Sequence, residues 1–192
     1  PTVRRLAFSP LISVLQTWQG LGYNRRAKFL WEAAKELVHT PQTVTRFNLV
    51  TKLEALPGVG PYTARAVAAF AYNQDVIFIE TNIRTAILHH FFTNKKSYSS
   101  APPSPKATEG HSETTKDEKV SDKDIIRILE QAYPKGKSRV WYYALMDYGA
   151  HLKKSGVKLN TRSKHYIKQS KFTGSNREAR GAILHALAQK PY

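Results

Sequence analysis

The segment Leu56–Ala64, which reads Leu-Pro-Gly-Val-Gly-Pro-Tyr-Thr-Ala, most constrains what this chain can fold into. A proline and two glycines two positions apart, followed by a helix-forming run, predict a tight turn that opens an α-helix. Gly58 and Gly60 can adopt positive φ angles and leave their backbone N–H groups open to an anion. The helix expected from Pro61 adds the positive end of its dipole. The turn is therefore suited to bind a backbone phosphate without recognising the base sequence. An ordinary turn between two helices would use the same residues and is the alternative interpretation.

The charge of the chain favours a polyanionic partner. Its 192 residues include 30 Lys and Arg against 14 Asp and Glu, which gives a formal net charge of +16. Such an excess points to nucleic acid first and to an anionic membrane second. The sequence shows no apolar run near the roughly 20 residues of a spanning helix and no signal peptide. We therefore expect that the protein has no membrane partner and is not secreted. We expect it in the cytoplasm or nucleoid if it is bacterial and in the nucleus if it is eukaryotic.

The apolar pattern is helical through most of the chain, so we expect an all-α protein. Residues 76–79 form a short extended apolar segment, after which Thr81 is expected to cap a helix. The pattern Ser175-x-x-Glu178 predicts a capping box at the start of the last helix.

Residues 95–124 interrupt the helical pattern and are expected to form a disordered insertion, because Ser, Thr, Pro, Lys and Glu replace large apolar residues. This segment holds six lysines and six acids, so the whole charge of +16 sits on the foldable remainder. The expected domains are an N-terminal helix that packs with the C-terminal lobe (1–24), a helical bundle with the hairpin (25–94), the insertion (95–124) and a C-terminal helical lobe (125–192).

A second basic stretch runs from Lys153 to Arg180, with nine Lys or Arg and one acid. Charge runs are usually solvated surfaces, but this density makes a second contact with a nucleic-acid backbone equally plausible. Lys171 and Arg177 are the candidates for that contact. His151 and His165 do not form a convincing ligand set, so we expect no metal site.

Four further motifs follow one another along the chain together with the hairpin. They are Gly20–Ala27 (G-L-G-Y-N-R-R-A), Phe78–Ile83 (F-I-E-T-N-I), Met146–Ala150 (M-D-Y-G-A) and Phe172–Gly181 (F-T-G-S-N-R-E-A-R-G). In this order they resemble the motifs of adenine DNA glycosylases of the MutY type, which belong to the helix-hairpin-helix DNA glycosylase superfamily. The resemblance covers the chain from about Pro1 to Leu187 apart from the insertion.

The resemblance implies an all-α, two-lobed glycosylase fold and a monofunctional enzyme of base-excision repair. Such an enzyme flips a mispaired base out of duplex DNA and hydrolyses its N-glycosidic bond. Adenine opposite guanine or 8-oxoguanine is the expected target, and thymine opposite guanine is the alternative. The implied partner is double-stranded DNA with a mismatch or an oxidised guanine, bound by a monomer. A non-catalytic helix-hairpin-helix DNA-binding module is the alternative from another class.

Two residues carry the implied chemistry. Glu80 stands where the family has the acid that stabilises the oxocarbenium-like sugar and helps to position water. A simple acid at a helix N-terminus, favoured by the dipole, is the alternative interpretation. Tyr62 stands where relatives that also nick the strand have a Schiff-base lysine. Tyrosine cannot form that imine, so the resemblance implies a monofunctional enzyme.

The resemblance also implies DNA contacts. Tyr23 stands where the family inserts an aromatic wedge into the base stack, although packing beside a glycine turn would explain it equally well. Arg25 and Arg26 are expected to contact phosphates. The remaining expected contacts are Gly58, Val59 and Gly60 of the turn, Asn82, and the two basic residues Lys171 and Arg177.

Three departures from the family qualify this expectation. The family places four cysteines for an iron–sulfur cluster soon after the motif at Met146–Ala150, whereas this chain has no cysteine, so it resembles a cluster-free branch without a cofactor. Glu80 replaces an aspartate, and a carboxylate displaced by ~1 Å can lose a hundredfold in rate. The family's proton-donating glutamate lies upstream of where this chain begins, so we expect an N-terminally shortened form with impaired activity.

Overall fold

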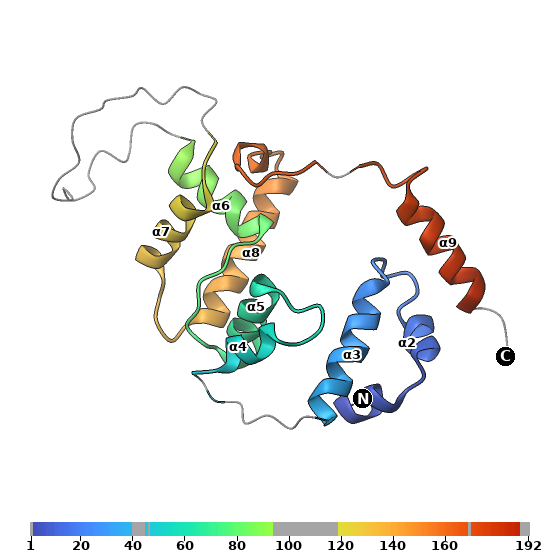
Figure 1. Cartoon of the computed structure of the whole chain (residues 1–192). Coiled ribbons are helices and arrows are strands. Elements are labelled where there is room, and N and C mark those ends of the chain that lie inside the picture. Colours follow the sequence, from blue (N-terminus) through green and yellow to red (C-terminus); the bar gives the residue numbers. More distant parts are fainter. Residues whose placement is uncertain (1, 40–44, 46, 94–118, 169, 189–192) are drawn as a thin grey trace. The chain divides into compact units, whose positions relative to one another are not determined.

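The computed structural model describes residues 2–39, 45, 47–93, 119–168 and 170–188, and the regular elements within them are helices (Figure 1). This confirms the all-α fold class. The expected disordered insertion lies, over its residues 95–118, outside the described part of the chain. The elements are α1 (Val3–Phe8), α2 (Leu11–Thr17), α3 (Arg25–His39), α4 (Leu49–Glu54), α5 (Pro61–Tyr72), α6 (Thr81–Phe92), α7 (Asp122–Ala132), α8 (Ser138–Lys154), the 3-10 helix η1 (Asn160–Arg162) and α9 (Asn176–Ala188).

Contacts between residues divide the chain into two compact units. The first comprises Pro1–Ala64 and Lys168–Tyr192, and the second comprises Arg65–Ile167. The first unit therefore joins the N-terminal helices to α9, while α6, α7 and α8 belong to the second. These boundaries differ from the four segments expected from the sequence, and that finer division stays a prediction.

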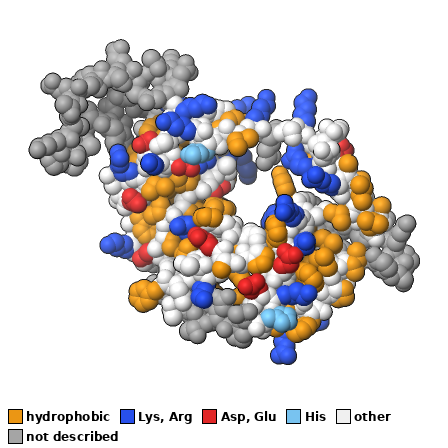
Figure 2. Space-filling view, in the orientation of Figure 1, with side chains coloured by type: hydrophobic (Ala, Val, Ile, Leu, Met, Phe, Trp, Pro, Cys, Tyr) orange, Lys and Arg blue, Asp and Glu red, His pale blue; other side chains and the backbone are white. Residues whose placement is uncertain are grey.

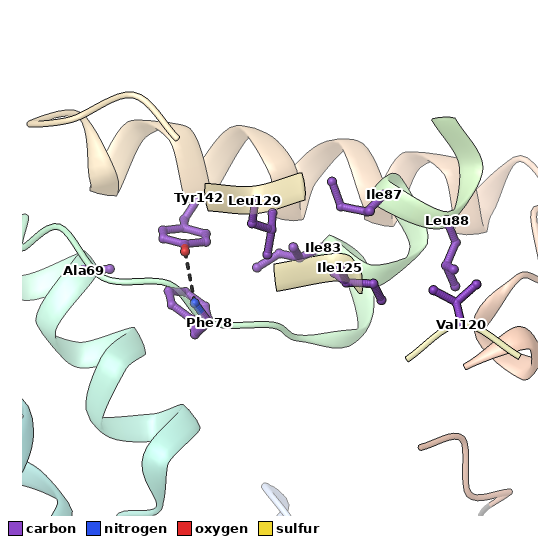
Figure 3. Close-up of a cluster of buried hydrophobic side chains, with 9 residues drawn as sticks. All are labelled: Ala69, Phe78, Ile83, Ile87, Leu88, Val120, Ile125, Leu129 and Tyr142. Atoms are coloured by element: carbon purple, nitrogen blue, oxygen red, sulfur yellow. Dashed lines mark hydrogen bonds between the residues drawn. The ribbon is translucent and has the colours of Figure 1, made fainter. Parts of the chain in front are cut away.

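The second unit is built on α6, which packs against α8 over a cluster of buried side chains (Figure 3). Tyr142 of α8 is completely buried in this cluster. Its ring stacks on Phe78 with ring centroids 4.0 Å apart, and its hydroxyl donates to the carbonyl of Val76 at 2.9 Å. The same hydroxyl accepts from the backbone N–H of Phe78 at 3.1 Å. Tyr142 thereby fixes the extended segment 76–79, and burial raises the pKa of its hydroxyl above the ordinary value.

A glycine lets α8 approach the first turn of α6 at backbone distance. A Cβ added at Gly149 would collide with the backbone carbonyl of Asn82. Gly149 is itself buried, so no other side chain fits there without moving one helix. The sequence element Met146–Ala150 therefore has a packing role at the start of α6.

Helix α7 begins at Asp122, inside the segment expected to be disordered. Ser121 and Asp124 form a reciprocal capping box at its start, and Val120 is buried and pairs with Ser163 in an isolated parallel bridge. Arg84 of α6 donates to both oxygens of Asp122, at 2.7 and 2.9 Å. The expected boundary at residue 124 missed this start because caps and ion pairs, rather than apolar side chains, define it.

The first unit packs α1 and α2 against α3. The indole N–H of Trp31 in α3 donates to the carbonyl of Ser9 at 2.9 Å and so links α3 to the connection between α1 and α2. At the start of α9, the predicted capping pattern is present in a shifted form. The Ser175 hydroxyl accepts from the N–H of Glu178 at 3.4 Å, while the Glu178 carboxylate reaches the N–H of Gly174 at 2.6 Å.

Substitution of Gly149 tests the close approach of α8 to α6. We expect Gly149→Ala to lower the free energy of unfolding by about 1–3 kcal/mol, since the added methyl group must push the backbone of Asn82 away. Gly181→Ala is the matched control, because Gly181 is also helical but faces open space. It should gain up to ~1 kcal/mol from helix propensity. Urea unfolding followed by circular dichroism measures both, and equal stability of Gly149→Ala and the parent chain would contradict the packing.

Candidate functional site

The hairpin turn connects α4, which ends at Glu54, to α5, which begins at Pro61. Of its two glycines, only Gly58 has a positive φ, at 73°. A Cβ at Gly58 would also lie 2.5 Å from atoms of the Phe29 side chain. Gly58 is therefore required both by the turn and by its packing on α3, whereas a Cβ at Gly60 would meet no atom within 4 Å.

The backbone donors of the turn are not equivalent. The N–H of Val59 donates to the carbonyl of Leu56 at 3.1 Å, so the turn itself uses it. The carbonyl of Gly60 accepts from the N–H of Ala64 at 3.0 Å, which makes Gly60 the N-cap of α5. The Gly60 N–H donates to no acceptor in the described part of the chain, and Gly60 is exposed. The end of the turn with an unused backbone donor is therefore Gly60, at the start of α5, where Tyr62 is 46% exposed.

Glu80 is the N-cap of α6, a position that the sequence assigned to Thr81. Its Oε1 atom accepts from the N–H of Asn82 at 2.5 Å and from the N–H of Ile83 at 3.0 Å. Thr81 is the first helical residue, and its hydroxyl donates to Glu80 Oε2 at 3.1 Å. The expectation for Thr81 was wrong because the longer glutamate side chain folds back over the free N–H groups of the first turn. These donors and the helix dipole hold a partly buried negative charge in place.

Lys153, in the last turn of α8, is a site residue that sequence reasoning missed. Its Nζ donates to the side-chain oxygen of Asn82 at 2.6 Å. Gly149 and Lys153 are four residues apart and so share one face of α8, the face that meets the start of α6. This spacing is the signal that could have revealed the contact. Carboxylate, amide and ammonium groups are thus gathered at the N-terminus of α6.

The first unit brings Tyr23 and Arg177 together. Tyr23 has a φ of 49° and is 59% exposed, and its hydroxyl accepts from Arg177 Nη1 at 3.5 Å. The guanidinium of Arg25 lies 5.1 Å from the ring centre of Phe29, and Arg26 lies 5.4 Å from that of Trp18. These two arginines are held over aromatic rings.

Lys171 differs from the other expected basic contacts. It is exposed on the segment before α9. Within the residues that the structure describes, its side chain forms no hydrogen bond or ion pair with the group around Tyr23.

The residues of this chain do not fit an iron–sulfur cluster. The sequence contains no cysteine, and the described residues contain no group of three or more His, Asp or Glu that could hold a metal ion. Within the same residues, no helix is long and apolar enough to cross a membrane.

Substitution of Glu80 tests its capping role separately from any chemistry. Glu80→Ala should lower the free energy of unfolding by about 1 kcal/mol, since two N–H groups lose their acceptor. Glu80→Gln keeps an acceptor oxygen and should lose less than half of that amount. Chemical unfolding measures both variants. If Glu80→Ala were as stable as the parent chain, Glu80 would not be the cap of α6.

A helix-hairpin-helix motif matches residues 47–70. The adenine DNA glycosylase of Mycobacterium tuberculosis (strain CDC 1551 / Oshkosh) is 44% identical over 87 residues, which is 45% of this chain and 28% of the relative. That of Homo sapiens is 39% identical over 88 residues, or 43% of this chain and 15% of the relative. That of Buchnera aphidicola subsp. Baizongia pistaciae is 32% identical over 94 residues, or 49% and 26%.

The chain therefore spans less than a third of the length of these relatives. Within that span, the resemblance inferred from the motifs is confirmed in both bacterial and eukaryotic proteins. This chain carries a helix-hairpin-helix motif and, over a little less than half of its length, is similar in sequence to adenine DNA glycosylases.

Proposed function

We propose that this chain is part of a monofunctional DNA N-glycosylase that removes adenine opposite guanine or 8-oxoguanine. The observation that carries the proposal is the placement of Glu80. Its carboxylate is fixed at the start of α6 by two backbone N–H groups, directly after a segment that buried Tyr142 holds in place. The similarity to adenine DNA glycosylases suggests that this carboxylate serves the hydrolysis of an N-glycosidic bond.

Binding to duplex DNA would rest first on the hairpin. The exposed Gly60 N–H and the positive end of α5 present a site for one backbone phosphate. The charge of +16 supplies the sequence-independent part of the affinity. Contacts of Gly58 and Val59 with DNA would be indirect, because Gly58 packs on Phe29 and the Val59 N–H is used inside the turn.

The group around Tyr23 would contact the duplex through one aromatic and several basic side chains. Tyr23 is an exposed aromatic residue held at a positive φ, a strained conformation that functional loops often retain. It would enter the base stack, while Arg25, Arg26 and Arg177 would contact phosphates. Lys171 and Asn82 complete the proposed contacts.

The chemistry would be hydrolysis at the sugar carbon that carries the base. As the N-glycosidic bond breaks, its electron pair leaves with the base and positive charge develops on the sugar. The carboxylate of Glu80 would stabilise that charge and orient the water whose oxygen bonds to the carbon. The proton that this water releases balances the proton that the departing base takes up, so the products are the free base and an abasic sugar. Tyr62 has no amine to form an imine with the opened sugar, so the strand would stay intact.

A non-catalytic DNA-binding module is the second candidate, and one specific observation favours it. Both carboxylate oxygens of Glu80 already accept hydrogen bonds at the start of α6. Capping alone would therefore account for this residue. The two candidates differ in whether loss of the Glu80 charge abolishes excision.

The first test compares Glu80→Gln with the parent chain in single-turnover excision. The substrates are duplexes with adenine opposite 8-oxoguanine, adenine opposite guanine and thymine opposite guanine. We expect Glu80→Gln to lower the excision rate at least about a hundredfold, since the charge is lost while the cap remains. Asp124→Asn is the matched control, because Asp124 is an acid at the start of α7. DNA binding without excision by the parent chain, and by any longer form of the protein, would favour the non-catalytic module.

The second test places a charge at the proposed phosphate site without removing the cap. Gly60→Asp provides a favourable N-cap for α5, but its carboxylate would repel a phosphate bound there. We expect duplex affinity to fall about tenfold, equivalent to ~1.4 kcal/mol, with no loss of stability. Gly60→Asn is the neutral control and should bind within about twofold of the parent chain. Equal affinities of the Asp and Asn variants, measured by fluorescence anisotropy, would exclude a phosphate at this position.

A further inference from the structure

The first unit contains an open pocket of about 830 Å³. The proposed DNA contacts Tyr23, Arg25, Arg26 and Arg177 form part of its lining, whereas its apolar residues and Arg180 have no role in the proposed function. We call it the α2–α9 groove. We call its apolar lining the floor and its basic lining the rim. The floor comprises Leu11 and Leu15 of α2, Phe29 of α3, Phe172, and Ile183 and Leu184 of α9.

The floor leaves large apolar side chains in contact with solvent. Ile183 and Phe172 are each 60% exposed. A concave apolar surface that stays uncovered commonly marks a place where another molecule binds.

The rim of the groove carries positive charge without acidic partners. Arg25, Arg26, Arg177 and Arg180 line it, and no acid does. Among the described residues, no carboxylate pairs with any of these four arginines. Arg25 and Arg26 lie over aromatic rings, and Arg177 donates to the carbonyl of Ser170 at 2.7 Å.

Lys28, at the same rim, is the contrasting case. It lies 3.4 Å from Glu32 one helical turn away and is therefore compensated. Figure 2 shows hydrophobic and basic side chains next to one another over the part of the surface that α9 contributes.

We propose that the α2–α9 groove docks an acidic amphipathic segment of a partner protein. Its apolar side chains would cover the floor, and its Asp and Glu side chains would pair with Arg180. They would also pair, in competition with DNA, with the three arginines of the proposed phosphate contacts. Four of the six floor side chains are aliphatic, and the guanidinium of Arg25 lies over the ring of Phe29. This favours the peptide over single-stranded nucleic acid, which is bound chiefly by stacking on aromatic rings. A second copy of this chain would bring further positive charge instead of complementing it.

The test uses substitutions at two positions outside the proposed DNA contacts. Ile183→Asp puts a charge on the apolar floor, and Ile183→Ser is a milder second variant. Both should fold, because Ile183 is exposed. Arg180→Glu reverses one rim charge. Arg127→Glu makes the same reversal at an exposed position of α7 and is the matched control.

Three labelled probes are titrated with the full chain and followed by fluorescence anisotropy. The first is a peptide of about 15 residues, four helical turns, with Leu and Phe on one face and Glu and Asp elsewhere. The second has the same composition in an order without an apolar face. The third is a single-stranded oligonucleotide of equal length and mixed sequence.

We expect the amphipathic peptide to bind about tenfold more tightly than the reordered one. Ile183→Asp should weaken its binding at least about tenfold, since a charge would have to be buried. Ile183→Ser should weaken it less, and Arg180→Glu about threefold to fivefold. Arg127→Glu should leave it unchanged.

Four results would overturn the proposal. Equal binding of the two peptides, or equal losses with Arg180→Glu and Arg127→Glu, would mean unspecific attraction to a basic surface. Binding of the oligonucleotide but not of the peptide, with dependence on Ile183, would make the groove a nucleic-acid site. Dimers of the parent chain that Ile183→Asp dissociates, measured by sedimentation, would assign the groove to a second copy.

Discussion

The hydrogen bonds of one buried tyrosine are the constraint on which the candidate catalytic residue depends. Residues 76–79 form no helix, and the Tyr142 hydroxyl binds their backbone from within the core, donating to Val76 and accepting from Phe78. The stacked ring of Phe78 adds apolar contact. Because this segment leads directly to Glu80, the packing of α8 determines where α6 begins. Residues 76–79, although irregular, thus hold a fixed geometry. A site that depends on the position of the Glu80 carboxylate needs such a geometry.

The start of α6 combines structural and chemical demands. Its free N–H groups need an acceptor, and the Glu80 carboxylate provides one while remaining partly exposed. Gly149 lets α8 approach the start of α6 closely. Lys153, one turn further along α8, can therefore donate a hydrogen bond to the side chain of Asn82. A carboxylate constrained in this way loses little freedom when a substrate approaches, which is the advantage of a preorganised charge. The same hydrogen bonds would form if Glu80 were only the N-cap of α6. The catalytic and the structural role therefore differ only in whether base excision depends on Glu80.

The sequence predicted the elements whose signals are local. Pro57, Gly58 and Gly60 predicted the turn before α5, and the Ser175 pattern predicted the cap of α9 because turns and caps depend on neighbouring residues. The sequence did not predict features that need contacts between distant residues. Lys153 meets Asn82 across 71 positions. Arg84 anchors the start of α7 at Asp122, and Val120 just before this helix is bridged to Ser163. The groove on the first unit could not be predicted either, because residues from α2 and α9 form it only after folding.

The identity of the reaction products tests the central claim most directly. A duplex with adenine opposite 8-oxoguanine, incubated with the protein, should release free adenine that mass spectrometry detects. One abasic site should appear for each adenine released, and the strand should stay intact until alkali cleaves it. We expect this result because Tyr62 stands where strand-cleaving relatives have a lysine, and tyrosine has no amine to form an imine with the sugar. Binding of the duplex without release of any base, or direct cleavage of the strand, would contradict the account.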